Sequence, residues 1–193
     1  MLVEVMVSMI ILIIGFVGIT KLQHVTKAAN AQSIQRTIAS DLADNLVERI
    51  RANPLGIGVY FPSDTPLELD GTYTVPTQTC TSTLQCNPNQ LATFDLYEWQ
   101  MQLMGGLDVS SSGASTGGLV DPVVCLLRPA GGGDGIYHIA IAWHGLTRLD
   151  NQVIAENANA SNCGTGDIGP YDATAGDDNQ YRRVHWQEVF LDV

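Results

Sequence analysis

The chain has 193 residues, among them 20 Asp or Glu and nine Lys or Arg, so its formal net charge at pH 7 is −11. Residues 54–193 hold sixteen of the acids and four Arg, which leaves this part a formal charge of minus twelve. Such a surface repels phosphate backbones, which argues against direct binding of nucleic acid and favours basic partners or cations. A simpler explanation, that the acids keep an exported domain soluble, stays open.

Residues 1–20 form an apolar segment that carries a single charge, at Glu4. A helix of this length, at ~1.5 Å per residue, is just long enough to cross a hydrocarbon core of ~30 Å. A cleaved secretory signal needs a basic stretch before the apolar run and a small-residue cleavage site after it, and the sequence shows neither pattern. The sequence therefore predicts a retained membrane-spanning anchor over residues 1–20.

Glu4 is a candidate functional residue because a carboxylate in hydrocarbon is costly unless it is protonated or paired. We expect it to pair with the N-terminal amine of a neighbouring subunit. The alternative is a carboxylate that merely sits at the level of the lipid headgroups. Gly15 and Gly18 either let another helix approach closely or allow local unwinding, and the sequence does not choose between these roles.

The helical pattern continues beyond the anchor, because no proline occurs before Pro54. Residues 21–53 are predicted to be amphipathic, with an apolar stripe spaced by four residues at Ile34, Ile38, Leu42, Leu46 and Ile50. One continuous helix from Met1 to Ala52 would be ~78 Å long at the standard rise. Asn53 and Pro54 end it, since proline disfavours a helical conformation in the residue before it and lacks a backbone donor.

Three features of this helix resemble PilV-type minor pilins of type IV pili, the type IV pilus modification protein PilV family. They are the early glutamate, the Ile-Gly-Phe-Val-Gly step at 14–18, and Asp-Leu-Ala-Asp-Asn-Leu-Val-Glu-Arg-Ile-Arg-Ala-Asn-Pro at 41–54. The resemblance implies a type IV pilin-like α+β fold, with a long N-terminal helix and a small head built on an antiparallel sheet. It also implies a structural, non-enzymatic role in which Glu4 aligns subunits in the membrane and neutralises the N-terminal charge during assembly. The implied partners are other major and minor pilins, the inner-membrane assembly machinery and a tip adhesin.

The resemblance further implies a short basic leader ending in Gly, cut by a prepilin peptidase that methylates the new N-terminus. Glu4 stands one position nearer the start than the family's glutamate, so we expect a leader and one mature residue to precede Met1. Lys21 and Lys27 follow the anchor and alone would place the C-terminal part in the cytoplasm, but a basic leader on the inner flank reverses that orientation. We therefore expect an inner-membrane protein with a periplasmic head before assembly and an extracellular pilus subunit after it.

Residues 55–193 are long enough for one hydrophobic core, and we expect one globular head. A short helix is predicted from Asn87-Pro88-Asn89 to the stop at Gly105-Gly106. Strands are predicted at 123–128 and 136–143, joined as a hairpin, then at 184–191, with a weaker candidate at 73–77. In the second of these strands one face is formed by Tyr137, Ile139, Ile141 and Trp143. This order of elements is typical of an α+β domain.

Four cysteines, all beyond the long helix, predict a disulfide framework in an exported domain. Three pairings are possible. We favour Cys80–Cys86, because a separation of six residues makes a short loop that is easily closed, and by elimination Cys125–Cys163. A zinc site is the competing explanation, but it lacks a Cys-x-x-Cys pair and a nearby histidine.

The stretches 110–118 and 157–178 are rich in Gly, Ser, Asn and Asp and are predicted to be surface loops. Oxygen atoms in the second stretch and just after it could ligate calcium, although their spacing matches no EF-hand; they belong to Asp172, Asp177, Asp178 and Asn179. We expect a solvated acidic loop there, and no cofactor or metal elsewhere.

The head offers no catalytic motif. His138, His144 and His185 occur without a Gly-x-Ser-x-Gly motif or a paired-histidine motif, so each is expected to be packed or to face solvent. The three tryptophans, Trp99, Trp143 and Trp186, are expected to be core aromatics rather than a carbohydrate platform.

Two alternatives to the pilus subunit follow from the same sequence. A pseudopilin of a type II secretion system shares the logic of the helix, although residues 41–54 favour the pilus version. A solitary membrane-anchored binding or sensor module belongs to another class, and it would gain stability from losing the charge of Glu4 because a lone anchor has no partner for it.

Overall fold

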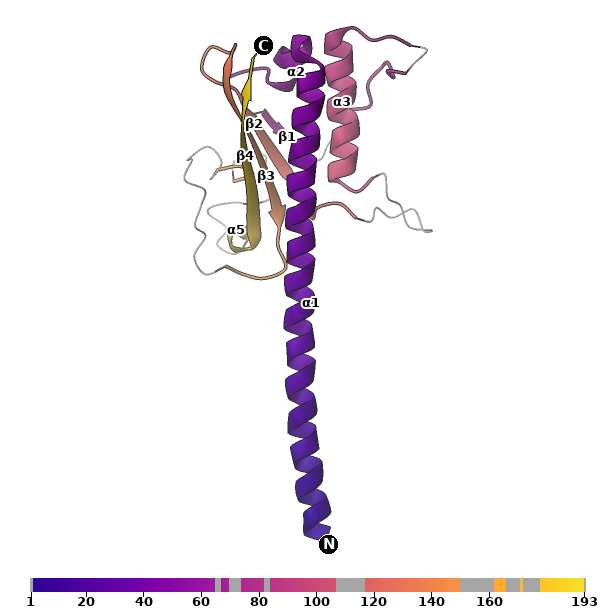
Figure 1. The fold of residues 1–193 in the computed structure, drawn as a ribbon, viewed down its shortest axis with the longest axis vertical. Coiled ribbons are helices and arrows are strands. Elements are labelled where there is room, and N and C mark those ends of the chain that lie inside the picture. Colours follow the sequence, from indigo (N-terminus) through magenta and orange to yellow (C-terminus); the bar gives the residue numbers. More distant parts are fainter. Residues whose placement is uncertain are drawn as a thin grey trace. The chain divides into compact units, whose positions relative to one another are not determined.

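The computed structural model describes residues 2–64, 67–69, 74–81, 84–106, 117–149, 162–165, 171 and 178–192. The chain forms two compact units, residues 1–34 and 35–193. Helix α1 (Leu2–Ala52) begins in the first unit and ends in the second, which also contains every other element (Figure 1). The head as a compact unit therefore begins at Gln35, inside the helix, whereas the sequence boundary separates residues 1–53 from residues 55–193.

The C-terminal part of α1 is one wall of the head's core. Its buried residues recur at spacings of three and four: Ala39, Leu42, Ala43, Leu46, Val47 and Ile50. The predicted helix is confirmed, but its predicted stripe is partly wrong, because Ile34 is 60% exposed. A strict spacing of four turns about 40° past a full rotation at each step, so Ile34 has drifted away from the face that Leu42 buries.

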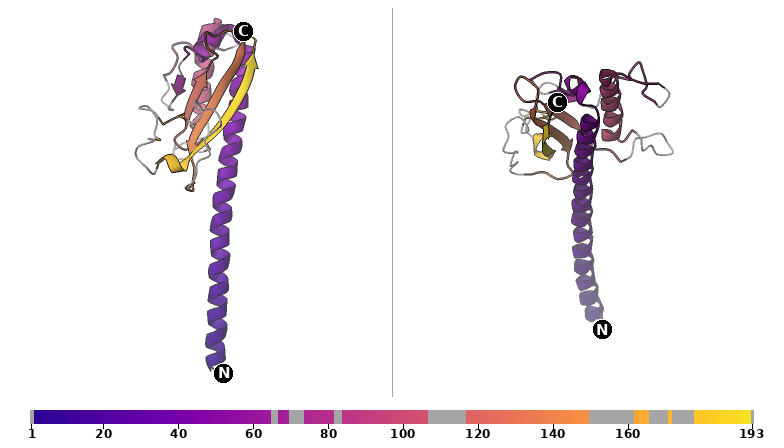
Figure 2. Two further views of the ribbon diagram at one scale, coloured as in Figure 1. Left: turned by 90° about the vertical axis from the view of Figure 1, so that its left-hand side faces the viewer. Right: turned by 45° about the horizontal axis from the view of Figure 1, so that its top comes forward.

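Helix α3 (Pro88–Leu103) confirms the predicted short helix. It begins with a capping box, in which the side chain of Asn87 accepts a hydrogen bond from the Gln90 amide and the Gln90 side chain accepts one from the Asn87 amide. Trp99 of α3 is fully buried, and its indole Nε1 donates to the carbonyl oxygen of Leu42 at 2.8 Å. In the head, α1 thus lies between α3 and the sheet (Figures 1 and 2).

The sheet is antiparallel, with strands in the order β1-β2-β3-β4. The strands are β1 (Leu67–Leu69), β2 (Val123–Leu127), β3 (Gly135–His144) and β4 (Arg182–Leu191). The predicted hairpin is the β2–β3 pair, closed by Gly131, Gly132 and Gly133, which all have positive φ. A long helix with a four-stranded antiparallel head confirms the predicted α+β, type IV pilin-like fold. The short elements are η1 (Pro54–Gly56), α2 (Ile57–Tyr60) and α5 (Asp178–Tyr181).

The weaker strand prediction at 73–77 is wrong for residues 74–77, which the structure describes without a strand. The first strand lies at β1 instead, where it pairs with β2. Pro76 accounts for the difference, since proline has no amide hydrogen to give to a sheet.

The two faces of the sheet pack against different partners. Tyr137, Ile139, Ile141 and Trp143 lie in the core with α1 and α3, as predicted for that face of β3. The opposite face buries Cys125, Ala140 and Ala142 with Cys163 and Tyr171. The prediction of a surface loop at 157–178 is therefore wrong for Cys163 and Tyr171, which are 1% exposed; most of that stretch and of 110–118 lies outside the described residues.

Polar side chains meet where β4 faces α1. The Gln187 side chain donates to Asp44 at 2.8 Å, and His185, two residues before it, lies on the same face of β4. Burial lowers the pKa of His185, the positive charge of Arg36 lowers it further, and the negative charge of Asp44 opposes both. The neutral imidazole is therefore the form that the folded head favours.

This lowered pKa predicts a loss of stability in acid. The unfolded chain binds the His185 proton more tightly than the folded head does. The free energy of unfolding is therefore unaffected by His185 above the unfolded pKa of about 6.5, and it decreases as the pH falls from there through the lowered pKa of the folded head. In urea unfolding of the full chain in detergent, we expect the midpoint to fall less between pH 7 and pH 5 in His185→Gln than in the unmodified protein. His24→Gln, at an exposed position on α1, is the control and should keep the full pH dependence. Equal pH dependence in His185→Gln and the unmodified protein would remove His185 as the cause.

Candidate assembly site

The N-terminal unit exposes an unbroken run of large apolar side chains. Within residues 2–25 each of the following is at least half exposed: Leu2, Val3, Val5, Met6, Val7, Met9, Ile10, Ile11, Leu12, Ile13, Ile14, Phe16, Val17, Ile19, Leu22 and Val25. Soluble monomers rarely expose contiguous apolar surface on this scale. The segment therefore needs lipid or other apolar helices around it.

α1 is also the one helix in the described part of the chain that could cross a membrane by length and composition. Its most apolar 18-residue window has a mean hydropathy of 2.7, and none of that window is buried within the chain. A core helix of a soluble protein passes the same test of length and composition, but a core helix would be buried. A signal sequence also passes it, so the choice between anchor and signal rests on the sequence pattern.

The hydroxyl groups of this segment bond to their own helix. Ser8 Oγ donates to the carbonyl oxygen of Glu4 at 2.7 Å, and Thr20 Oγ1 donates to those of Phe16 and Val17 at 3.2 and 2.9 Å. Such local bonds let a hydroxyl enter an apolar environment without losing a partner. They leave Glu4 as the main electrostatic cost of placing residues 2–20 in lipid.

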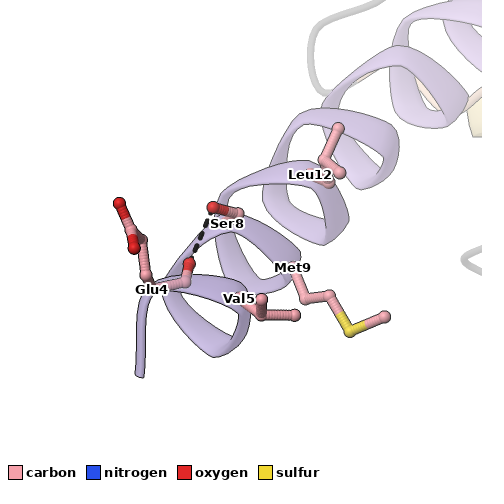
Figure 3. A pocket seen from close by; sticks show the side chains of 5 residues that line it. All are labelled: Glu4, Val5, Ser8, Met9 and Leu12. Carbon is pink, nitrogen blue, oxygen red and sulfur yellow. Dashed lines mark hydrogen bonds between the residues drawn. The ribbon is translucent and has the colours of Figure 1, made fainter. Parts of the chain in front are cut away.

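Glu4 lies in the first turn of α1, and its carboxylate points away from the helix and from Ser8 (Figure 3). Together with Val5, Ser8, Met9 and Leu12 it lines a shallow depression on the helix surface. Within the described residues, the carboxylate has no hydrogen-bond or ion-pair partner. The geometry presents it to whatever surrounds the helix.

Gly15 and Gly18 stand on this exposed surface. A Cβ atom built on either would meet nothing within 4 Å. No contact inside the chain requires glycine at these positions, which keeps both sequence-based roles open: close approach of another helix, and local unwinding.

The string at 41–54 forms the junction between α1 and the two helices that follow. Arg49 Nη1 contacts Asp95 Oδ1 at 3.0 Å and Glu98 Oε2 at 3.2 Å, while Tyr60 donates its hydroxyl hydrogen to Asp95 Oδ2 at 2.6 Å. Burial, followed by the bond to Asp95, raises the pKa of Tyr60. Asn53, itself buried, donates from Nδ2 to the carbonyl oxygen of Pro88 at 2.8 Å.

Sequence reasoning missed this junction. A signal was present, because Asp95 and Glu98 flank the apolar positions Leu96 and Trp99 of α3 and therefore lie at the edge of its buried face. The string at 41–54 thus has a structural role, because Arg49 and Asn53 fix the end of α1 to α3.

The cysteines form the two pairs that the sequence favours, Cys80–Cys86 and Cys125–Cys163. The second joins β2 to the short described segment 162–165, whose Cys163 carbonyl accepts a hydrogen bond from buried Arg182 at 2.7 Å. A crosslink over a separation of 38 residues restricts the unfolded chain and contributes on the order of 3–4 kcal/mol.

The remaining candidates form no site in the described residues. Asp172 and Asp177 lie outside the described part of the chain, as does the side chain of Asp178, and the described residues hold no cluster of three or more potential metal ligands. His138 stacks on Trp186 and His144 on Tyr181, with ring centroids 4.8 and 5.1 Å apart. The expectation of a core aromatic is confirmed for Trp99 and Trp143 but is wrong for Trp186, which is only partly buried on the outer face of the sheet.

Residues 21–97 match the family model described as Tt1218-like, type IV pilin Tt1218. The match supports a type IV pilin. It covers less than half of the chain, and it does not distinguish the PilV type among pilins. No curated protein and no solved structure matches the chain.

The matched range contains most of the junction of this pilin-like chain. Arg49, Asn53, Tyr60, Pro88 and Asp95 all lie within residues 21–97. The match therefore includes the contacts that join α1 to α2 and α3, together with β1, whereas β2, β3 and β4 lie outside it.

Gly56 offers a test of this junction, because a Cβ atom there would lie 2.5 Å from Asn53 Nδ2 and 2.9 Å from both Ala92 Cβ and the Pro88 carbonyl oxygen. We expect Gly56→Ala to destabilise the head by about 1–3 kcal/mol, as overpacking does. Gly58→Ala is the matched control, since a Cβ there meets nothing within 4 Å, and it should be neutral or slightly stabilising in α2. Denaturant unfolding of the full chain in detergent measures both, and equal stability of the two variants would contradict the close approach described here.

Proposed function

We propose that this chain is a structural minor pilin of the PilV type that assembles through α1 into a type IV pilus, within its initiation or tip complex. The match over residues 21–97 supports the pilin class, and the string at 41–54 supports the PilV type. Its partners are other major and minor pilins, the inner-membrane assembly machinery and a tip adhesin. Pilins act structurally, and no enzymatic activity is proposed.

The observation that carries this proposal is the exposed apolar segment of α1 with one unpaired carboxylate near its start. Lipid tails solvate Leu and Ile as well as another helix does, so apolar side chains alone do not drive helices together in a membrane. Small residues and polar groups provide that preference, and this segment offers Gly15, Gly18 and Glu4. Pairing Glu4 with the N-terminal amine of a neighbour replaces a costly lone charge by an ion pair.

The location follows from the same features. Before assembly the anchor holds the subunit in the inner membrane with the head in the periplasm, and after assembly the head lies on the outside of the pilus. Two disulfides in the head suit an oxidising compartment. The head's formal charge of minus twelve supports a subunit that does not itself grip nucleic acid.

Replacement of Glu4 tests the proposal. In cells that produce the full-length protein, we expect Glu4→Ala and the isosteric Glu4→Gln to insert in the membrane and form both disulfides, yet to be excluded from sheared pili. The reason is that neither side chain can pair with an amine as a carboxylate does. Ser8→Ala is the matched control on the same face, and it should be incorporated normally because its hydroxyl bonds only within the helix. The readout is immunoblotting of pilus and membrane fractions.

The outcomes separate the alternatives. Undiminished incorporation of both Glu4 variants would overturn the assembly contact. A Glu4 effect on protein secretion, with pili unchanged, would favour the type II secretion pseudopilin. Normal function of a Glu4→Ala protein that is never found in pili would favour a solitary membrane-anchored module.

The roles of Gly15 and Gly18 are separable by side-chain size. If another helix approaches closely, Gly18→Ala should be tolerated and Gly18→Leu should exclude the subunit from pili. If local unwinding is required, Gly15→Ala together with Gly18→Ala should already block incorporation, because each change favours the helix by about 1 kcal/mol. Pilus fractionation checks these variants, and incorporation of all of them would contradict both roles.

A further inference from the structure

Two lysines and a histidine follow directly after the apolar segment of α1. Lys21 comes next after Thr20, and His24 and Lys27 follow at intervals of three residues. All three are exposed, and neither lysine has an ion-pair partner within the described residues. Residues 5–40 contain no Asp or Glu, so this stretch of the helix supplies no carboxylate to neutralise them. We call Lys21, His24 and Lys27 the basic face.

The basic face occupies one side of the helix. Three residues turn an α-helix by about 300°, so successive members of the face differ by about 60° and the set spans about 120°. Leu22 and Val25 fall outside this arc. Along the axis Lys21 and Lys27 are ~9 Å apart at the standard rise. The two lysines can therefore meet a single surface together.

The direction of the side chains turns this face toward the membrane. In an α-helix each Cα–Cβ bond tilts toward the N-terminus, and a long side chain covers the turn before its own Cα atom. The apolar segment lies on the N-terminal side of the basic face, so Lys21 and Lys27 lean back toward the lipid that surrounds that segment. The aliphatic stem of a lysine lies along apolar surface while its ammonium group reaches the interface.

The length of the apolar segment favours the same contact. Residues 2–19 rise by ~27 Å, slightly less than the ~30 Å hydrocarbon core. A membrane span that is slightly short is accommodated by local thinning of the bilayer and by flanking side chains that reach back to the interface. Lys21 then lies at the level of the lipid headgroups. Lys27 is ~9 Å beyond it, and its side chain leans back over that distance.

We infer that the basic face binds the phosphate groups of anionic phospholipids, in the leaflet on the C-terminal side of the apolar segment. The occupant follows from continuity, because the apolar segment itself brings a lipid surface to these lysines and an anionic leaflet attracts cations within a Debye length of ~8 Å. The contact sets the depth of the anchor. Glu4 is ~25 Å from Lys21 along the axis, so holding Lys21 at one headgroup layer places Glu4 near the other. This inference rests on the proposed function only for the membrane-anchored state.

Lipid selectivity of the full chain tests the contact. The protein is reconstituted in phosphatidylcholine vesicles that contain a trace of spin-labelled phosphatidylglycerol or spin-labelled phosphatidylcholine. Electron spin resonance measures the fraction of each labelled lipid that is immobilised at the protein surface. One lysine near an anionic surface changes an affinity about fivefold, so we expect a preference for phosphatidylglycerol of at least about fivefold. High salt should reduce it, because it screens exposed charges.

Variants of the two lysines identify the cause of the preference. Lys21→Gln with Lys27→Gln should bring the preference close to one, and Lys21→Glu with Lys27→Glu should invert it. Lys21→Arg with Lys27→Arg keeps both charges and should keep the preference. Arg51→Gln is the control for loss of an exposed cation of α1 away from the apolar segment, and it should change nothing. Formation of both disulfides shows that each variant has folded.

Two results would overturn the inference: an unmodified protein without lipid preference, or a preference that survives in Lys21→Gln with Lys27→Gln. In the first case, exclusion of that double variant from pili would assign the lysines to a protein partner instead.

The proposed function is judged separately by the Glu4 variants. If these are excluded from pili and the lipid preference does not depend on the lysines, the pilin proposal stands and only the lipid contact fails. If the preference depends on the lysines and Glu4 has no effect on incorporation, the lipid contact stands without the Glu4 assembly contact.

Discussion

The hydrogen bond from the Trp99 indole to the Leu42 carbonyl marks the constraint on which the head depends, because α1 must supply one wall of its core. Ala39, Ala43 and Leu46 are fully buried on that wall. Small side chains at 39 and 43 allow close packing, and removing the larger ones would leave cavities that typically cost 2–5 kcal/mol each. The sheet alone therefore offers an incomplete core, and the second half of α1 is as much a part of the head as β3 is.

The two halves of α1 differ in which of their apolar side chains are buried. From Gln35 onward its apolar residues form a stripe and its polar residues lie outside, as in a soluble protein. Before Ile34 the large side chains are exposed all round, which suits a membrane or a bundle of similar helices. The proposed function uses both patterns. The second half of α1 completes the head, and the exposed first half is held in lipid before assembly and by neighbouring helices afterwards.

Much of the fold could be predicted from the sequence, because its signals are local. The absence of proline before Pro54, the Asn87–Gln90 capping box and the alternation in β3 each determine structure within a few residues. Contacts between distant residues could not be predicted in the same way. Arg49 meets Asp95 across 46 positions, Tyr171 is buried from within a polar stretch, and β1 pairs with β2 across a long connection. The role of Glu4 depends on molecules outside the chain, so neither sequence pattern nor fold determines it.

The self-bonded hydroxyls of Ser8 and Thr20 have a consequence for how such a helix finds its place among others. With those groups satisfied internally, residues 5–20 present an apolar surface that contains no charge, and the two glycines, Gly15 and Gly18, are its main irregularities. A single carboxylate near one end breaks that uniformity. In the proposed assembly this carboxylate fixes the axial position of the helix, because only one position brings it to an opposite charge. If the proposal holds, the scarcity of polar groups in the segment is what lets one residue specify the register between neighbouring helices.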